Sequence, residues 1–177
     1  GKGVEQDYEE AVKWFYKVAK NVHADAQFTL GVIYSREKNY DEAIKWYRRA
    51  ANQGHVKSQF NLGCIYGGEG EELNYEEAVK WLRMAAEQGY SGAQNNLGTC
   101  YLDGEGVEQN YEEAVRWYSL AAEQENAFAQ CNLGNCYKDG KGVEQDKDKA
   151  IEWYRKASDN GCEEAKEALD ELQGNKD

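Results

Sequence analysis

Five tryptophans recur along the chain at nearly equal intervals, and the residues around each one are almost the same. The intervals are 32, 35, 36 and 36 residues, and the segments "YEEAVKW" at 75–81 and "YEEAVRW" at 111–117 differ at one position. A leucine follows each tryptophan after 16 residues, inside a second repeated segment such as "NNLGTCY" at 95–101. Self-similarity at such a period predicts a repeat array, in which each unit buries its apolar face on its neighbours. The tryptophans are Trp14, Trp46, Trp81, Trp117 and Trp153.

Each unit is predicted to be a pair of helices joined by a loop. Residues 93–103 and 111–124 place apolar side chains at helical spacing, and glycine and polar residues separate the two segments. Asn110 is the predicted N-cap of the second helix. We expect Gly98 to let the two helices approach closely, and Trp117 to fill the space between the layers as a core residue.

Glycines at repeat-locked positions mark where the second helices end. Gly54, Gly89 and Gly161 suit the left-handed conformation that closes a helix. Val22 and Glu125 hold the corresponding positions, so these two turns are expected to close differently or less well.

Composition excludes several classes of function. The chain has no proline, which suits an all-helical fold. Its net charge is −12, from 33 acidic and 21 basic residues, whereas nucleic-acid binding needs a clustered basic footprint. No apolar run approaches the ~20 residues that span a bilayer, so membrane insertion is not expected. Many acidic residues fall in first helical turns, where pairs such as Glu76–Lys80 and Glu112–Arg116 indicate a solvated face.

No metal, cofactor or catalytic site is predicted from local motifs. The two histidines, His23 and His55, are 32 residues apart, and no CxxC, CxxH or His-x-x-x-His spacing occurs. Stacked helices lie about 8–10 Å apart, beyond the ~7 Å between Cα atoms that a disulfide tolerates. We therefore expect free thiols and a reducing compartment such as the cytoplasm. The cysteines are Cys64, Cys100, Cys131, Cys136 and Cys162.

The repeated residues resemble the Sel1-like repeat family, a branch of the tetratricopeptide-like helical repeats. The resemblance covers essentially the whole chain. It implies a right-handed α-solenoid of antiparallel helix pairs, and a function as an adaptor or scaffold for protein complexes without shared catalytic residues. In one unit the family pattern reads Ala93, Leu97, Gly98, Tyr101, Gly104, Gly106, Val107, Ala114, Trp117, Ala121 and Ala122.

Three segments depart from that pattern. Residues 34–40 lack the Gly-x-Gly-Val loop, so this loop is closer to the short tetratricopeptide type. Residues 1–4 match the loop at 140–143, which suggests a fragment that starts after an absent helix. Its exposed helix at 7–20 is then expected to fray or to self-associate. Residues 162–173 are expected to form a capping helix with a polar outer face. The predicted divisions are 1–22, 23–54, 55–89, 90–125, 126–161 and 162–177.

By the same resemblance, the first helix of each pair lines an inner, concave wall. With the repeated leucine counted as position seven, positions two, five, nine, twelve and thirteen should face a groove. These positions vary most between units whose core residues barely change. They are Asp25, Phe28, Val32, Ser35 and Arg36, then Lys57, Phe60, Cys64, Gly67 and Gly68, then Gly92, Asn95, Thr99, Leu102 and Asp103, and then Phe128, Cys131, Asn135, Lys138 and Asp139.

The sequence therefore predicts a non-enzymatic scaffold that binds a protein or peptide segment on this wall. The alternative interpretation of the wall is that it contacts only solvent and binds no partner. At the level of function the alternatives are a rigid spacer within a larger repeat protein, and a small-molecule binder or hydrolase. No nucleophile or acid–base group in a recognisable arrangement supports the last of these.

Overall fold

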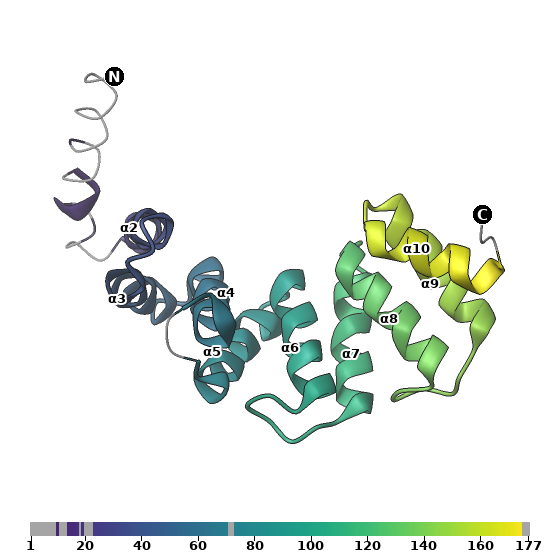
Figure 1. Ribbon diagram of the computed structural model, residues 1–177. Helices are drawn as coiled ribbons and strands as arrows, with labels where there is room; N and C mark the ends of the chain where they lie inside the picture. The colour runs from purple at the N-terminus through teal and green to yellow at the C-terminus, as the bar shows by residue number, and fades with distance from the viewer. Residues whose placement is uncertain (1–9, 11–13, 18, 20–22, 71–72, 175–177) are drawn as a thin grey trace. The chain divides into compact units, whose positions relative to one another are not determined.

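The structure is a computed structural model that describes residues 10, 14–17, 19, 23–70 and 73–174 (Figure 1). Every regular element within these ranges is helical, and successive helices pack against each other in pairs. The predicted all-α solenoid class is confirmed. No helix among the described residues combines the length and the apolar character needed to cross a membrane.

Contacts between residues divide the chain into two compact units, Gly1–Met84 and Ala85–Asp177. The first unit contains α2 (Ala24–Arg36), α3 (Tyr40–Ala51), α4 (Val56–Cys64), the π-helical turn η1 (Ile65–Glu69) and most of α5 (Tyr75–Glu87). The second contains α6 (Ser91–Asp103), α7 (Tyr111–Ala122), α8 (Ala127–Asp139), α9 (Lys147–Asp159) and α10 (Glu163–Gln173).

Most of the predicted half repeat at 1–22, with its self-associating helix, lies outside the described residues. Trp14 is described, and 61% of its surface is exposed. This side chain belongs to the helix at 7–20 that the sequence analysis expects to be exposed. The core position predicted for Trp117 is confirmed, and Trp46 and Trp81 are buried as well, each at most 5% exposed, whereas Trp153 is half-buried.

Side-chain caps fix where the second helices begin. The Asn110 Oδ1 atom accepts a hydrogen bond from the backbone N–H of Glu113 at 3.0 Å, as predicted. Asn39, Asn74 and Asp146 cap α3, α5 and α9 in the same way, at 3.2, 3.1 and 3.0 Å. Each cap satisfies one of the N–H groups that have no partner within the helix.

Ion pairs on the helix surfaces differ in register from the predicted i,i+4 pairs. Lys80 pairs with Glu77 at 3.2 Å, and Arg116 pairs with Glu113 at 3.0 Å. Both pairs are spaced i,i+3, so the second glutamate of each first turn, and not the first, faces the cation.

A glycine on the first helix of each pair allows close packing against the second helix. A Cβ atom built on Gly98 would lie 2.7 Å from the ring of Tyr118, and one built on Gly134 would lie 2.6 Å from the ring of Tyr154. The Tyr118 hydroxyl then reaches Thr99 Oγ1 at 3.0 Å. The close approach predicted for Gly98 is confirmed.

A buried glutamine occupies the same place in four first helices, three residues before the repeated leucine. Each donates from Nε2 to a carbonyl in the last turn of the preceding helical segment. Gln27, Gln94 and Gln130 also accept, at Oε1, from an amide near the end of the following helix, so that each of these side chains joins three segments. The bonds donated by the glutamines are Gln27 to Ala19 at 2.9 Å, Gln59 to Ala51 at 3.1 Å, Gln94 to Ala86 at 3.1 Å and Gln130 to Ala122 at 3.2 Å. The bonds accepted by the glutamines come from Gln53 to Gln27 at 2.6 Å, from Gln124 to Gln94 at 2.8 Å and from Asn160 to Gln130 at 3.0 Å.

The turns after the second helices close as predicted at three positions. Gly54, Gly89 and Gly161 have φ angles of 85°, 86° and 92°. Glu125 has a φ of 59° and so adopts the same left-handed conformation without being glycine. The turn therefore does not close differently, but it closes less well, as the second half of the prediction states, because a left-handed φ strains a residue other than glycine. Val22 lies outside the described residues.

Candidate protein-binding surface

The predicted wall of the first unit is formed by α2 and α4. Asp25, Arg36 and Lys57 are exposed. Phe28 and Val32 are half-buried and pack against the core cluster that contains Tyr47. The Phe28 ring centroid lies 5.9 Å from that of Tyr47. The two apolar wall residues therefore support the helix stack and also present part of their surface.

A hollow of about 230 Å³ lies between α2 and α4. Val32, Ile65 and Tyr47 supply apolar surface, while Arg36 and Asn61 supply polar groups. Three wall residues predicted from the sequence line this hollow together. The lining residues are Val32, Ser35, Arg36, Tyr47, Asn61 and Ile65.

His55 joins the wall at the start of α4. Its Nδ1 atom accepts from the backbone N–H of Ser58 at 3.2 Å, which caps the helix. Its Nε2 atom faces the carboxylate of Asp25 at 3.3 Å, and its ring contacts that of Phe28 in a tilted arrangement, with 4.8 Å between the ring centroids. Because the Asp25 side chain is 96% exposed, water screens this pair strongly and it contributes little to stability.

In the second unit the predicted wall residues are largely engaged in internal contacts. Thr99 bonds to Tyr118, Asn95 Oδ1 accepts from Asn132 Nδ2 at 3.0 Å, and Asn135 Oδ1 accepts from the Tyr154 hydroxyl at 2.6 Å. Burial raises the pKa of both tyrosines above the ordinary value. Leu102 packs against the core, Lys138 is half-buried, and Phe128 is 61% exposed.

Cys131 is an exception among the predicted wall residues. It is 6% exposed and packs with Tyr154, Ala165 and Cys162 in a core cluster. Its predicted place on an open wall is therefore wrong, because α9 and α10 cover position five of this unit. All five cysteines carry free thiols.

Cys131, Cys162 and Glu164 form a cluster that the sequence analysis missed. The two Sγ atoms and a Glu164 carboxylate oxygen all lie within 4.8 Å of one another. The Cys162 thiol donates to Glu164 Oε2 at 3.8 Å. Burial, and then the neighbouring Cys162, raise the pKa of Cys131 to about 12.

The repeat itself contained a signal for this cluster. Cys162 precedes its repeated leucine by seven residues, as His55 does, and each lies over position five of the unit before it. The separations are 27 residues from Phe28 to His55 and 31 from Cys131 to Cys162. The difference of four is the difference between the 32-residue and 36-residue repeats. Local spacings such as CxxC do not reveal this relation, because the two residues lie in different units.

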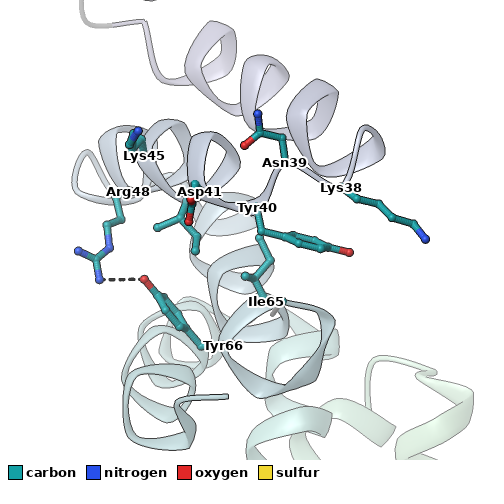
Figure 2. Close-up of a pocket in the computed structure, with 10 residues that line it drawn as sticks. Lys38, Asn39, Tyr40, Asp41, Lys45, Arg48, Ile65 and Tyr66 are labelled. Atoms are coloured by element: carbon teal, nitrogen blue, oxygen red, sulfur yellow. Dashed lines mark hydrogen bonds between the residues drawn. The ribbon is translucent and has the colours of Figure 1, made fainter. Parts of the chain in front are cut away.

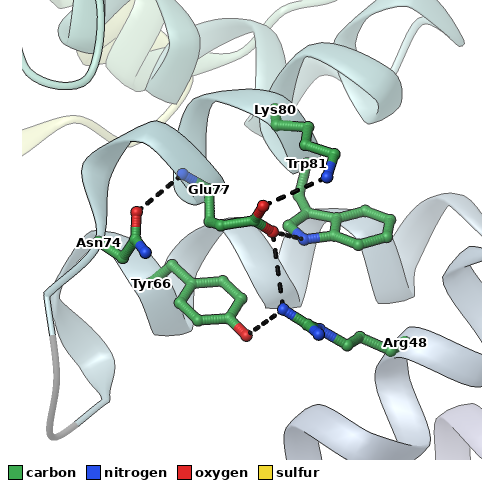
Figure 3. Close-up of polar contacts among 6 residues, drawn as sticks. All are labelled: Arg48, Tyr66, Asn74, Glu77, Lys80 and Trp81. Carbon is green, nitrogen blue, oxygen red and sulfur yellow. Dashed lines mark hydrogen bonds and ion pairs between the residues drawn. The ribbon is translucent and has the colours of Figure 1, made fainter.

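A polar network links α3, η1 and α5 in the first unit (Figure 3). Arg48 Nη2 donates to the Tyr66 hydroxyl at 2.9 Å and lies 3.7 Å from Glu77 Oε2. The same carboxylate oxygen accepts from Trp81 Nε1 at 3.1 Å. Among the described residues, the buried indole N–H groups of Trp46 and Trp117 have no such partner. The network therefore gives the indole N–H of Trp81 a hydrogen-bond partner that those of Trp46 and Trp117 lack.

Beside this network is a larger cavity of about 590 Å³ at the start of α3 (Figure 2). Tyr40, Tyr66 and Ile65 line it, and Lys38 and Lys45 border it. In the second unit, Val143 of a Gly-x-Gly-Val loop packs on the core around α7. The segment after η1 lacks that valine. The cavity mixes cations with Asp41, so its charge favours no single class of ligand.

Family models match most of the chain. Residues 1–23, 56–90, 91–126 and 127–162 match the Sel1 repeat, and residues 24–53 match a tetratricopeptide repeat. The latter range contains the short loop predicted to be of that type, where α2 and α3 are separated by three residues, 37–39. No curated protein matches the chain in a sequence search.

Several solved structures are similar to the chain. A Sel1 repeat protein from Oxalobacter formigenes has 37% identity and a TM-score of 0.82, over 89% of this chain and 65% of that one. A protective antigen of uropathogenic Escherichia coli with an SLR fold has 37% identity and a TM-score of 0.78, over 85% and 33%. Helicobacter pylori cysteine rich protein B has 25% identity and a TM-score of 0.57, over 71% and 96%. The chain thus spans less than two thirds of the length of the first two.

Proposed function

This chain belongs to the Sel1 repeat family, and we propose that it is a non-enzymatic scaffold that binds a protein segment on the faces of α2 and α4. Proteins of this family generally act as protein-interaction scaffolds. The single observation that carries the proposal is the hollow of about 230 Å³ between the two helices, because three of its six lining residues, Val32, Ser35 and Arg36, are wall positions that the repeat pattern assigns to α2.

The lining of the hollow suggests what it binds. Val32, Ile65 and Tyr47 provide a floor for one apolar side chain, and Arg36 at its edge would pair with a carboxylate. The occupant is then an extended segment with an apolar residue next to an acidic one. Phe28 and Phe60 occupy position five of successive units and would extend the apolar surface along the wall. In the second unit the corresponding contacts would come from Asn95, Thr99, Leu102, Phe128, Asn135 and Lys138.

Catalysis in this hollow is not proposed. None of its six lining residues is a histidine, an aspartate, a glutamate or a cysteine, which are common general bases and nucleophiles of enzymes. Scaffold proteins of this kind are generally non-catalytic. A rigid spacer remains the competing function, and it differs from a scaffold in having no selected ligand.

Selection of peptides from a random display library against the immobilised chain tests the proposal. Selected peptides should carry an apolar–acidic pair, and Arg36→Glu should weaken their binding at least tenfold while circular dichroism and thermal melting stay unchanged. Leu120→Ala, an exposed change on α7 of the other unit, is the matched control and should bind normally. Failure to select any peptide favours the spacer, and full binding by Arg36→Glu contradicts the proposed face.

A further inference from the structure

We infer that Cys131, Cys162 and Glu164 form a site for a thiophilic divalent cation, of which Zn²⁺ fits best. The inference is independent of the proposed peptide surface. The three ligand atoms come from the middle of α8 and from the first turn of α10, including its N-cap residue. Bound metal would therefore fasten α10 to α8.

The distances suit tetrahedral coordination. Zn–S bonds of about 2.3 Å place two sulfurs about 3.8 Å apart, and a Zn–O bond of about 2.0 Å places an oxygen about 3.5 Å from each sulfur. The three ligand atoms lie within 4.8 Å of one another, and Cys162 Sγ is 3.8 Å from Glu164 Oε2. Small side-chain rotations are enough to bring all three onto one ion.

The two sulfur ligands of the site are buried, whereas the carboxylate ligand is exposed to solvent. Cys131 and Cys162 are 6% and 3% exposed, and Tyr154 and Ala165 pack around them. Glu164 is exposed. An ion can therefore enter along the carboxylate and keep one water molecule as its fourth ligand, while the sulfurs stay shielded from solvent.

The charge balance also favours occupancy. Binding replaces two S–H bonds with two metal–sulfur bonds and releases two protons to water. Two thiolates and one carboxylate around a divalent cation leave a net charge of −1. This charge lies at the N-terminus of α10, where the helix dipole stabilises negative charge, and Lys138 provides a nearby positive charge.

Titration of the reduced, metal-free chain with Co²⁺ tests the inference, since thiolate ligation produces a charge-transfer band in the near ultraviolet. We expect a 1:1 complex whose band disappears when Zn²⁺ is added. Cys162→Ala should abolish the band. Cys136→Ala, a buried change in the same helix α8, is the matched control and should retain it.

Glu164→Gln provides a second test if a cysteine variant does not fold, because the Glu164 side chain is exposed and its replacement should leave the fold intact. Loss even of an outer partner of a metal ligand costs about 10–100-fold in affinity, so loss of this ligand should weaken Zn²⁺ binding, measured by competition with a chelating indicator, at least tenfold. The inference is overturned if folded, reduced chain shows no thiolate band at millimolar Co²⁺. A band that survives Cys162→Ala, or a Zn²⁺ affinity unchanged by Glu164→Gln, overturns it equally.

Discussion

Replacing Gln94 with methionine should destabilise the second unit by an amount that can be worked out from its hydrogen bonds. Gln94 is 4% exposed, and methionine has a similar length, so packing changes little. Two bonds are lost, one to the Ala86 carbonyl at 3.1 Å and one from Gln124 at 2.8 Å. At about 0.5–1.5 kcal/mol each, the expected loss is about 1–3 kcal/mol.

The partners of Gln94 keep other hydrogen bonds, which limits the cost to that sum. The Ala86 carbonyl still accepts from the Gly89 N–H at 2.9 Å, and Gln124 Nε2 still donates to the Leu120 carbonyl at 3.1 Å. Neither group is left without a partner when Gln94 is replaced.

Urea unfolding followed by circular dichroism measures the effect, with Gln124→Met as the matched control. The control removes one of the two bonds from an exposed position, so it should cost about half as much as Gln94→Met. If Gln94→Met is as stable as the parent chain, or if both variants lose the same stability, the glutamine does not join the helices in the way described.

Three further changes test other parts of the structure. Glu125→Gly should stabilise the chain by up to about 1 kcal/mol in urea unfolding. Glycine adopts a left-handed φ without strain, and the change also removes an acidic group from the end of α7. A loss of stability would contradict the claim that Glu125 is strained. Tyr118→Phe should cost about 0.5–1.5 kcal/mol through the lost bond to Thr99, and a neutral effect would show that this bond is not formed. Burial raises the pKa of Cys100 and of Cys136 to about 11 from an ordinary value near 9. As the pH rises, the thiols ionise in the unfolded chain before they do in the folded chain. The stability that these groups contribute is therefore present below pH 9 and should fall between pH 9 and 11. A urea midpoint that does not fall across this range, measured against Cys100→Ala, would count against the burial of these thiols.

Much of the fold could be predicted from the sequence because it depends on local chemistry repeated in register. Asn110 caps a helix because of its own side chain and the next turn. Gly98 marks close packing because any larger residue at that place would meet Tyr118. Such relations need only one unit of the array, so the repeat displays them several times over.

Other features depend on contacts between units and were missed. The buried glutamines recur at the repeat period, but their role requires knowing that a first helix contacts the helix before it as well as the helix after it. Cys131 was placed on an open wall because the resemblance assigns position five there, whereas Cys162 and α9 cover it. The bonds of Arg48 to Tyr66 and Glu77 join three elements, and no single repeated segment contains them.

The main point of the wall prediction is that a ligand occupies the wall. Arg36, Lys57 and Phe128 are exposed, as a binding surface requires. Phe28 and Val32 are shared between the surface and the core. Variants of these two residues would therefore change both stability and binding, and Arg36 is the cleaner choice because it is outside the core.

Amide hydrogen exchange of the chain, with and without a selected peptide, tests the central claim most directly. A scaffold that holds its ligand in the hollow between α2 and α4 should show slower exchange in residues 28–36 and 57–65, and unchanged exchange in α9 and α10. Peptide binding that protects α3 and α5 while leaving α2 and α4 unchanged would contradict the claim, and would move the binding site to the other face of the helix pairs.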